Sequence, residues 1–478
     1  MNKIVFVIIL LFLLINLHDL RNWYYSAIGD EYAFYNFAKA IATGEMSPNI
    51  FSQKGVYNVI PTLSSYYQAI VMQILGIDVF GWKASHVLLI SSTIFGIYLL
   101  TKKLFNQKVA ILTSWFYSSN FLIWGYVHTG YSNIEALFPF VFSLATFAYK
   151  KFFLSGFFAA LGFYTFHTSR VTIFVILTLI ILSYRNSKLI RTSRNMLFGF
   201  AFLIIPFMVT NKDFLIQDMF LRSIVAQNDP SAYGPAYKFV FDNIIRNTLA
   251  PFYNNHNAPY ISGPILDYVT GIFLAIGTIQ LIRKRADIPL TVLYILTIYT
   301  IPFIAVAVFS PYGYTVLSRL HILIPAYSIL AGFGASEFFR LIKPKRIQLF
   351  TIFFVCIFTI LLNMYAFFIK TPKAVAGTIE SITIKALTDS CKSSMSPTIV
   401  GNVKPLLTPA LVAYNLQPLL IENKDGFTFD LQNTDCLILM QPDGEQLDYY
   451  NKQANNFNYL YSEVADNTGT RKVILFTK

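Results

Sequence analysis

Two adjacent carboxylates, Asp30 and Glu31, follow the first apolar segment of the chain by about a dozen residues. They therefore stand where a chain that leaves a bilayer meets water. Beyond them Phe34, Ala38 and Ile41 recur at helical spacing, which predicts a short amphipathic helix on the membrane surface. Acidic residues suit a first helical turn because its free N–H groups favour negative charge. The pair is thus either a helix start or a catalytic base at the boundary between water and lipid.

Two arginines stand apart from the other positive charges of the chain. Arg170 and Arg319 each lie at the predicted external end of an apolar helix, beside His167 and His321 respectively. An arginine in that position requires an anionic partner, and a phosphate group would meet its planar fork of donors. The alternative is an interfacial anchor, which fits His167 better than Arg170. The sequence does not show whether the two arginines meet.

Glu135 opens another apolar segment. An acid at the edge of a bilayer is costly unless it pairs or lines a wet cavity, so Glu135 is a candidate second acid or acceptor-binding residue; the alternative is a side chain that reaches out to water. His256 lies in the loop 211–263, whose rings and amides suit sugar binding but are equally typical of any ordered surface loop. His167 and His321 are further candidates for acid or acceptor-binding roles.

The composition indicates a polytopic α-helical membrane protein. Hydrophobic residues make up 55% of the 478 residues and charged residues only 13%, and the mean hydropathy is +0.53. This is too apolar for a soluble protein of that length. The net charge of +13 is spread over short loops between apolar segments, so it does not indicate a nucleic-acid partner.

We predict about eleven transmembrane helices. Clusters of Lys and Arg occur in alternate loops, as at 102–108 and 283–285, which predicts a cytoplasmic N-terminus and an external C-terminus in the plasma membrane. No small-residue cleavage site follows the first segment, so we expect it to remain as the first span. The predicted spans lie near residues 4–17, 84–100, 109–125, 133–149, 152–168, 171–184, 195–210, 264–282, 288–308, 318–336 and 347–369.

Three regions are expected outside the membrane. The loop 18–83 should hold two surface helices, the second of which begins after Pro61 and ends at Gly76. The loop 211–263 follows the seventh predicted span. Residues 371–478 resemble a small α/β domain with an accessory role, and no phosphate-binding loop, zinc spacing or nucleophile elbow occurs in it.

Within residues 371–478, short apolar runs alternate with helical stretches. Strands are expected from Thr398, Pro418, Cys436 and Arg471, and helices near 373–390, 406–415 and 445–454. Cys391 and Cys436 both belong to this region, where they either pair in an oxidising compartment or remain free thiols.

The ensemble of these features resembles the GT-C class of membrane glycosyltransferases, in the branch of the protein O-mannosyltransferases and the lipid A aminoarabinose transferases. The resemblance covers residues 1 to about 370. It rests on four features: the acidic pair in a first external loop, the Pro-initiated helix ending in Leu-Gly, the stretch Gly162-Phe-Tyr-Thr-Phe-His-Thr-Ser-Arg170, and the stretch Ser318-Arg-Leu-His-Ile-Leu-Ile-Pro325. One departure is Val59-Ile60-Pro61, where the family commonly has a His or Lys before proline.

The resemblance implies an inverting transfer of a sugar from a polyprenyl-phosphate carrier to an acceptor hydroxyl. Asp30 would deprotonate the acceptor, Glu31 would bind the acceptor or orient Asp30, and Glu135 or Asn133 would take the place of a second acid. Arg170 or Arg319 would stabilise the charge of the departing phosphate. No cofactor or metal is assumed, and the acceptor, which could be a protein, a lipid or a glycan, is not specified.

Two other functions fit a basic polytopic chain. A transporter or flippase of lipid-linked sugars would share the composition, but the sequence has no clear internal repeat and few charges midway through the spans, where such carriers place their sites. A second alternative is an enzyme fold kept as a scaffold for the external domain.

Overall fold

The structure is a computed structural model, and it describes most of the chain. Only the backbone is described for residues 30, 58, 183, 187–192, 236 and 422. The described residues are 3–18, 20, 30–58, 60–183, 187–212, 236–253, 263–310, 317–374, 378–391, 394, 397–401, 407, 411, 416–422, 431–440, 442, 444–465 and 472–478.

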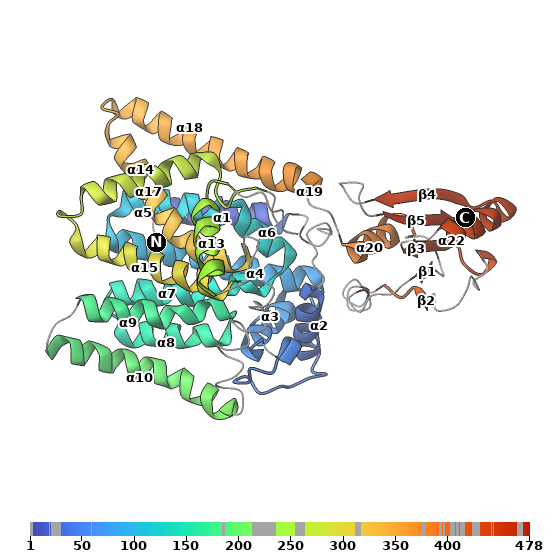
Figure 1. Ribbon diagram of the computed structural model, residues 1–478, viewed down its shortest axis with the longest axis horizontal. Coiled ribbons are helices and arrows are strands. Elements are labelled where there is room, and N and C mark those ends of the chain that lie inside the picture. The colour runs from blue at the N-terminus through green and yellow to red at the C-terminus, as the bar shows by residue number, and fades with distance from the viewer. Residues whose placement is uncertain are drawn as a thin grey trace.

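Apolar helices form the body of the molecule (Figure 1). In the part of the chain that the structure describes, five helical segments are long and apolar enough to cross a membrane by length and composition: 79–104, 193–210, 289–309, 317–340 and 345–374. Shorter helices occupy the other predicted spans, so the count of eleven stays a prediction. The helices of the body are α1 (Lys3–Leu17), α4 (Val79–Leu104), α5 (Gln107–Ser118), α6 (Phe121–Thr129), α7 (Leu137–Ala148), α8 (Phe152–Leu161), α9 (Val171–Ser183), α10 (Ser187–Thr210), α14 (Tyr268–Arg283), α15 (Pro289–Phe309), α17 (Ile324–Arg340) and α18 (Lys345–Met364).

The predicted span 109–125 is divided between two helices. α5 ends at Ser118, and Asn120 caps the start of α6 by accepting hydrogen bonds from the N–H groups of Leu122 and Ile123. A single apolar run therefore contains a break, because the side chain of Asn120 competes with the helical backbone for its N–H groups.

The helices of the body pack closely where glycines face one another. A Cβ atom on Gly277 of α14 would lie 1.9 Å from the carbonyl oxygen of Leu330, and one on Gly334 of α17 would lie 2.1 Å from that of Phe273. Small residues allow two membrane helices to approach until their backbones touch. α14 and α17 are thus held together by a contact that no side chain could enter.

Two helices precede α4 at the places where the sequence predicted them; their location on the membrane surface stays a prediction. α2 (Asp30–Ala42) begins at the acidic pair. α3 (Thr62–Leu75) begins after Pro61 and ends at Gly76, whose φ of 119° suits glycine alone. α2 packs on α3, and α3 packs on α4.

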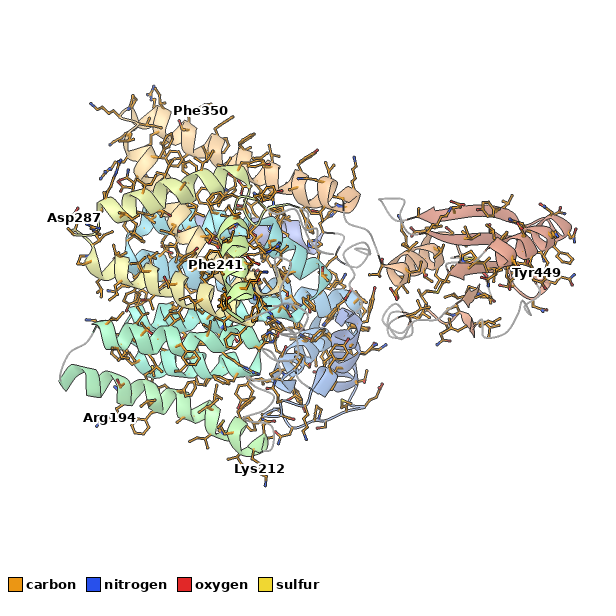
Figure 2. All side chains as sticks on the ribbon, in the orientation of Figure 1. Arg194, Lys212, Phe241, Asp287, Phe350 and Tyr449 are labelled. Carbon is orange, nitrogen blue, oxygen red and sulfur yellow. A yellow bond between two sulfur atoms is a disulfide. The ribbon has the colours of Figure 1, made fainter. Side chains whose placement is uncertain are left out.

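Short helical turns connect the longer helices at the end of the helical body that lies opposite the α14–α15 and α17–α18 turns. They are η1 (Val56–Asn58), η2 (Ser132–Ala136), η3 (Gly162–Tyr164), η4 (His167–Arg170), α16 (Leu317–Leu320), η7 (His321–Leu323), the π-helical η8 (Tyr365–Lys370) and α19 (Thr371–Ala374). A further helix, α13 (Ala236–Leu249), packs on α15. The turns α14–α15 and α17–α18 lie at the opposite, left-hand end in Figure 1, and Asp287, labelled in Figure 2, marks the first of them.

The C-terminal part contains a five-stranded mixed sheet in the order β2-β1-β3-β5-β4. β1 is parallel to β2 and β3, whereas β5 is antiparallel to β3 and β4. The sequence did not predict β4, whose side chains are mostly exposed. The elements are α20 (Ile379–Asp389), β1 (Pro397–Gly401), β2 (Leu419–Glu422), η9 (Leu431–Asn433), β3 (Cys436–Met440), α22 (Gly444–Phe457), β4 (Leu460–Ala465) and β5 (Lys472–Thr477).

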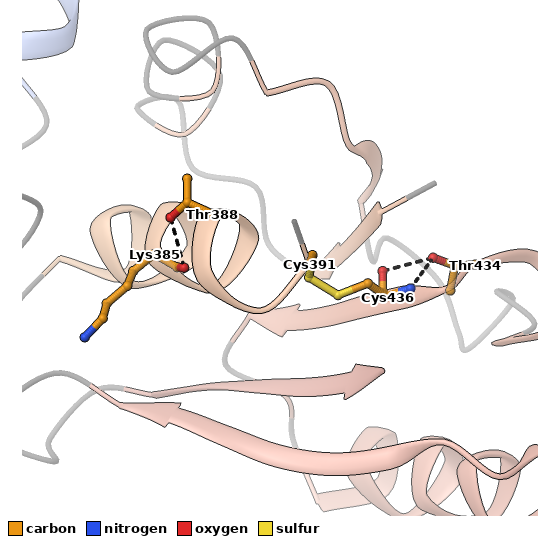
Figure 3. Close-up of a disulfide and its surroundings, with 5 residues drawn as sticks. All are labelled: Lys385, Thr388, Cys391, Thr434 and Cys436. Atoms are coloured by element: carbon orange, nitrogen blue, oxygen red, sulfur yellow. Dashed lines mark hydrogen bonds between the residues drawn. A yellow bond between two sulfur atoms is a disulfide. The ribbon is translucent and has the colours of Figure 1, made fainter. Parts of the chain in front are cut away.

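Alternate residues of the central strand enter two separate cores. Ile438 of β3 shares a buried cluster with Ile382 of α20, whereas Leu437 belongs to a second cluster with Tyr450 of α22. The period of two along a strand thus places one helix on each face of the sheet. A disulfide joins Cys391, just after α20, to Cys436 at the start of β3 (Figure 3). Of the two states left open by the sequence, the structure has the paired one.

Candidate active site

A buried polar cluster surrounds Glu135, which is only 1% exposed. The Ser64 hydroxyl donates to Glu135 Oε2, and Gln68 Nε2 donates to Oε1 over 2.6 Å. His86 Nε2 of α4 lies 3.4 Å from the same Oε1. Glu135 therefore does not reach out to water: its carboxylate joins η2 to α3 and α4.

The partners of Glu135 are themselves fixed by further contacts. Gln68 accepts a hydrogen bond of 3.0 Å from the indole N–H of Trp82 and donates one of 3.2 Å to Ser132. The Trp82 ring packs against Gly130, where a Cβ atom would lie 2.6 Å from Cη2. The chain can make this approach because Gly130 ends α6 in the left-handed conformation, with φ 76°.

Tyr67 lies beside this cluster on α3. Its hydroxyl donates to the carbonyl of Ser85 over 3.0 Å. Burial, and then the negative charge of Glu135, raise the pKa of Tyr67 well above its ordinary value. The phenol therefore stays protonated and keeps donating to α4.

Aromatic contacts link α2 to the Glu135 cluster and to η7. The Tyr35 and Trp82 rings meet edge to face at 5.6 Å, and Phe34 meets Tyr131 in the same way at 6.0 Å. Tyr131 in turn stacks on Tyr126, whose ring lies 5.4 Å from that of His321. The helix that begins at Asp30 is therefore packed against the elements that carry the other candidate residues.

Arg170 is 9% exposed, and a residue of the loop before α3 holds its guanidinium group. Its Nη2 donates to Gln53 Oε1 over 3.2 Å, and the Gln53 backbone N–H donates to Asn211 at the end of α10. The guanidinium lies over the Phe163 ring at 5.8 Å. Among the described residues, its buried Nε has no hydrogen-bond partner. One donor of a buried cation is thus left for a further group.

Arg319 and His321 are brought to the same end by short contacts between turns. Asn133 Nδ2 donates to the Ser318 carbonyl over 3.3 Å, and Thr168 Oγ1 lies 3.5 Å from His321 Nε2. Arg319 is 8% exposed and His321 is fully buried. η2, η4 and the α16–η7 turn therefore meet around these side chains.

His167 connects the two arginines. Arg319, Arg170 and His321 all lie within electrostatic reach of its ring. The imidazole is exposed and packs 3.8 Å from the Phe166 ring. The structure thus gathers two guanidinium groups and two imidazoles at one place, and the charge of the two guanidinium groups favours an anion there.

The remaining candidates are less fully described. Asp30 begins α2, but its side chain lies outside the described part. Glu31 is buried, with 2% exposed. His256 lies outside the described residues. The two acids therefore belong to a helix that packs on the site, and the direction of the Asp30 carboxylate stays a prediction.

Sequence reasoning missed Gln53, Gln68 and His86. A signal for Gln68 was present, because Ser64 and Gln68 stand four residues apart and so lie on one face of the predicted helix. No comparable pattern marks Gln53 or His86. Within the described part of the chain, no group of three His, Cys, Asp or Glu side chains could hold a metal ion.

Comparison with solved structures identifies the fold. ArnT from Cupriavidus metallidurans, crystallised with undecaprenyl phosphate, aligns with a TM-score of 0.54 and 11% identity over 98% of this chain and 97% of that chain. The chain has the fold of the GT-C membrane glycosyltransferases. The apo oligosaccharyltransferase from Archaeoglobus fulgidus aligns with a TM-score of 0.51 and 12% identity over 89% of this chain, which spans 61% of that chain. No family model matches the sequence, and no curated protein matches it.

Proposed function

We propose that the chain transfers a sugar from a polyprenyl-phosphate donor to an acceptor hydroxyl on the outer face of the membrane. The observation that carries this proposal is the pair of cations Arg170 and Arg319, which both lie within electrostatic reach of the His167 ring, in a fold shared with ArnT, whose structure holds undecaprenyl phosphate. A lipid phosphate presents its charge at the membrane surface. The pair has the sign and the location that such a phosphate requires.

In this proposal Asp30 is the base. It removes the proton of the acceptor hydroxyl while the oxygen attacks the anomeric carbon, and the bond between that carbon and the phosphate oxygen breaks. Attack from the face opposite the phosphate inverts the anomeric centre. The leaving phosphate gains negative charge, which Arg170 and Arg319 stabilise.

In this proposal Glu135 is a positioning residue. One of its oxygens accepts a hydrogen bond from Ser64 and the other from Gln68, so it keeps η2 fixed against α3, on which α2 packs. Asn133 holds Ser318, the residue before Arg319. η2 thus couples the helix that starts at Asp30 to the proposed phosphate site.

The predicted orientation is consistent with this site. The basic turn α14–α15 lies at the end of the helices far from the sheet (Figure 1), as the positive-inside rule expects for the cytoplasmic side. The disulfide between Cys391 and Cys436 is typical of an oxidising, external compartment. We propose that residues 371–478 form an external accessory domain.

The test is an assay of the purified, detergent-solubilised protein with synthetic polyprenyl-phosphate sugars, after its bound lipid has been identified by mass spectrometry. The proposal predicts release of free polyprenyl phosphate together with glycosylation of an acceptor hydroxyl. A protein that moves these lipids across a vesicle membrane without cleaving them would be a flippase, and the proposal would be wrong.

A further inference from the structure

Helix α13 buries two asparagines, Asn243 and Asn247, together with Phe239 on the side that faces the protein. Asn243 is 2% exposed and donates from Nδ2 to the carbonyls of Ala307, at 3.0 Å, and Ser310, at 3.1 Å. These two carbonyls belong to the last turn of α15 and the residue that ends it. One turn farther along α13, Asn247 is also 2% exposed. The helix is therefore attached to the end of a candidate membrane span through the amide of Asn243.

The outward side of α13 carries mostly apolar side chains, with Lys238 and Thr248 also exposed among them. Phe241, labelled in Figure 2, is 62% exposed, and Tyr237 is 77% exposed. A helix on the surface of a soluble protein has the reverse arrangement, with its apolar stripe turned inward. Large apolar side chains turned outward fit an environment of hydrocarbon. The exposed apolar residues of this face are Tyr237, Phe241, Ile244, Ile245 and Leu249.

The attachment to α15 fixes the depth of α13. α15 has 21 residues and is therefore about 31 Å long, which matches the hydrocarbon thickness of a bilayer. Ala307 and Ser310 lie at its C-terminal end, opposite the basic α14–α15 turn. α13 therefore lies at one boundary of the hydrocarbon, on the side away from the basic turn.

Exposed aromatic side chains near α13 indicate the same boundary of the hydrocarbon. Tyr268 opens α14 and is 74% exposed, and Phe252 and Tyr253, just beyond α13, are 50% and 63% exposed. Phe252 packs beside Gly271 of α14, where a Cβ atom would lie 3.3 Å from its ring. Such rings gather at the boundary between lipid and water. α15, on which α13 packs, also carries exposed apolar residues, such as Ile304 at 51%.

We propose that α13 is an interfacial helix embedded in the outer leaflet, where its apolar face binds the acyl chains of membrane lipids. Asn243 fixes this depth by tying the helix to α15. Within the loop 211–263, α13 therefore serves as a lipid contact. The proposal depends on membrane insertion and is independent of the transfer reaction.

Spin labels in lipid vesicles test the proposal. Cys356, the free cysteine of the chain, is replaced by serine, and a label is attached at Phe241→Cys or, in a separate variant, Ile245→Cys. Phe353→Cys, on an exposed face of α18, is the lipid control, and Glu445→Cys, exposed on α22, is the water control. Collisions with oxygen and with a water-soluble nickel complex are measured by power saturation.

The proposal predicts that labels at 241 and 245 collide with oxygen several-fold more than with nickel, as the label at 353 does. A preference for nickel like that at 445 would overturn it, since the helix would then lie in water. Protection from both reagents would also overturn it, because protein, such as a second copy of the chain, would then cover this face.

Discussion

Gln68 on α3 donates a hydrogen bond of 2.6 Å to Glu135 of η2, which lies 67 residues away in the sequence. The carboxylate is 1% exposed, so its partners replace the water that it loses. We expect Glu135→Gln to lower the free energy of unfolding by about 1–3 kcal/mol, because an amide at 135 leaves one buried donor or acceptor unmatched. Thermal unfolding in detergent measures this change.

A double-mutant cycle with Gln68→Leu tests whether the hydrogen bond between Gln68 and Glu135 accounts for this loss. The two changes together should cost less than the sum of the single changes, by about 0.5–3 kcal/mol, since both remove the same hydrogen bond. Gln417→Leu, at an exposed position far from the cluster, is the control and should combine additively. Additivity of Gln68→Leu with Glu135→Gln would contradict the proposed positioning role.

Arg170 and Arg319 are expected to bind the donor phosphate. Changing either to Ala should weaken binding of a polyprenyl-phosphate donor by about 10- to 100-fold, because a hydrogen bond to a charged group contributes about 1.5–3 kcal/mol. Lysine should restore only part of the affinity, since its ammonium lacks the planar fork. Arg283→Ala, at the opposite end of the helices, is the matched control. Unchanged donor affinity in both alanine variants would remove these residues from the site.

Gly277 allows α14 and α17 to touch. Any side chain there meets the Leu330 carbonyl at 1.9 Å, so Gly277→Ala should separate the helices and cost about 1–3 kcal/mol. Gly271→Ala on the same helix meets only the Phe252 side chain at 3.3 Å and should cost less. The comparison cancels the gain in helix propensity, which both changes share. Equal thermal midpoints for the two variants would show that this close contact does not limit stability.

The Cys391–Cys436 disulfide closes a loop with a sequence separation of 45. A cross-link over such a loop stabilises a fold by about 2–4 kcal/mol. We expect the double change of both cysteines to serine to make residues 371–478 sensitive to protease under conditions in which the parent chain resists. Cys356→Ser, which removes the third cysteine, is the control. Equal resistance of all three proteins would mean that the cross-link contributes nothing.

Local chemistry made part of this fold predictable. Pro61 and Gly76 marked the ends of α3. Proline fixes φ at a value that suits the start of a helix, and glycine readily adopts the positive φ with which many helices end. The acidic pair marked the start of α2. By contrast, β4 escaped prediction because Leu460 to Ala465 are mostly exposed, so no buried alternate face marks an edge strand. The break at Asn120 was hidden inside a continuous apolar run.

The candidate site was predictable as single residues but not as an arrangement. Glu135 stood out because an acid beside an apolar run requires a partner, yet its partners come from α3 and α4, and packing alone brings them together. The same holds for Arg170 and Arg319, which lie 149 positions apart in the chain and both act on His167. Gln53, an amide in a polar loop, had no pattern to distinguish it.

The most direct test of the central claim is the rate of sugar transfer by Asp30→Asn. Asparagine caps a helix about as well as aspartate, so α2 should still form, but the proton acceptor is gone. Transfer from the synthetic polyprenyl-phosphate donor should fall by a factor on the order of 10² to 10⁴, the usual contribution of a general base, while donor lipid still binds. Transfer at the parent rate would contradict the assignment of Asp30 as the base.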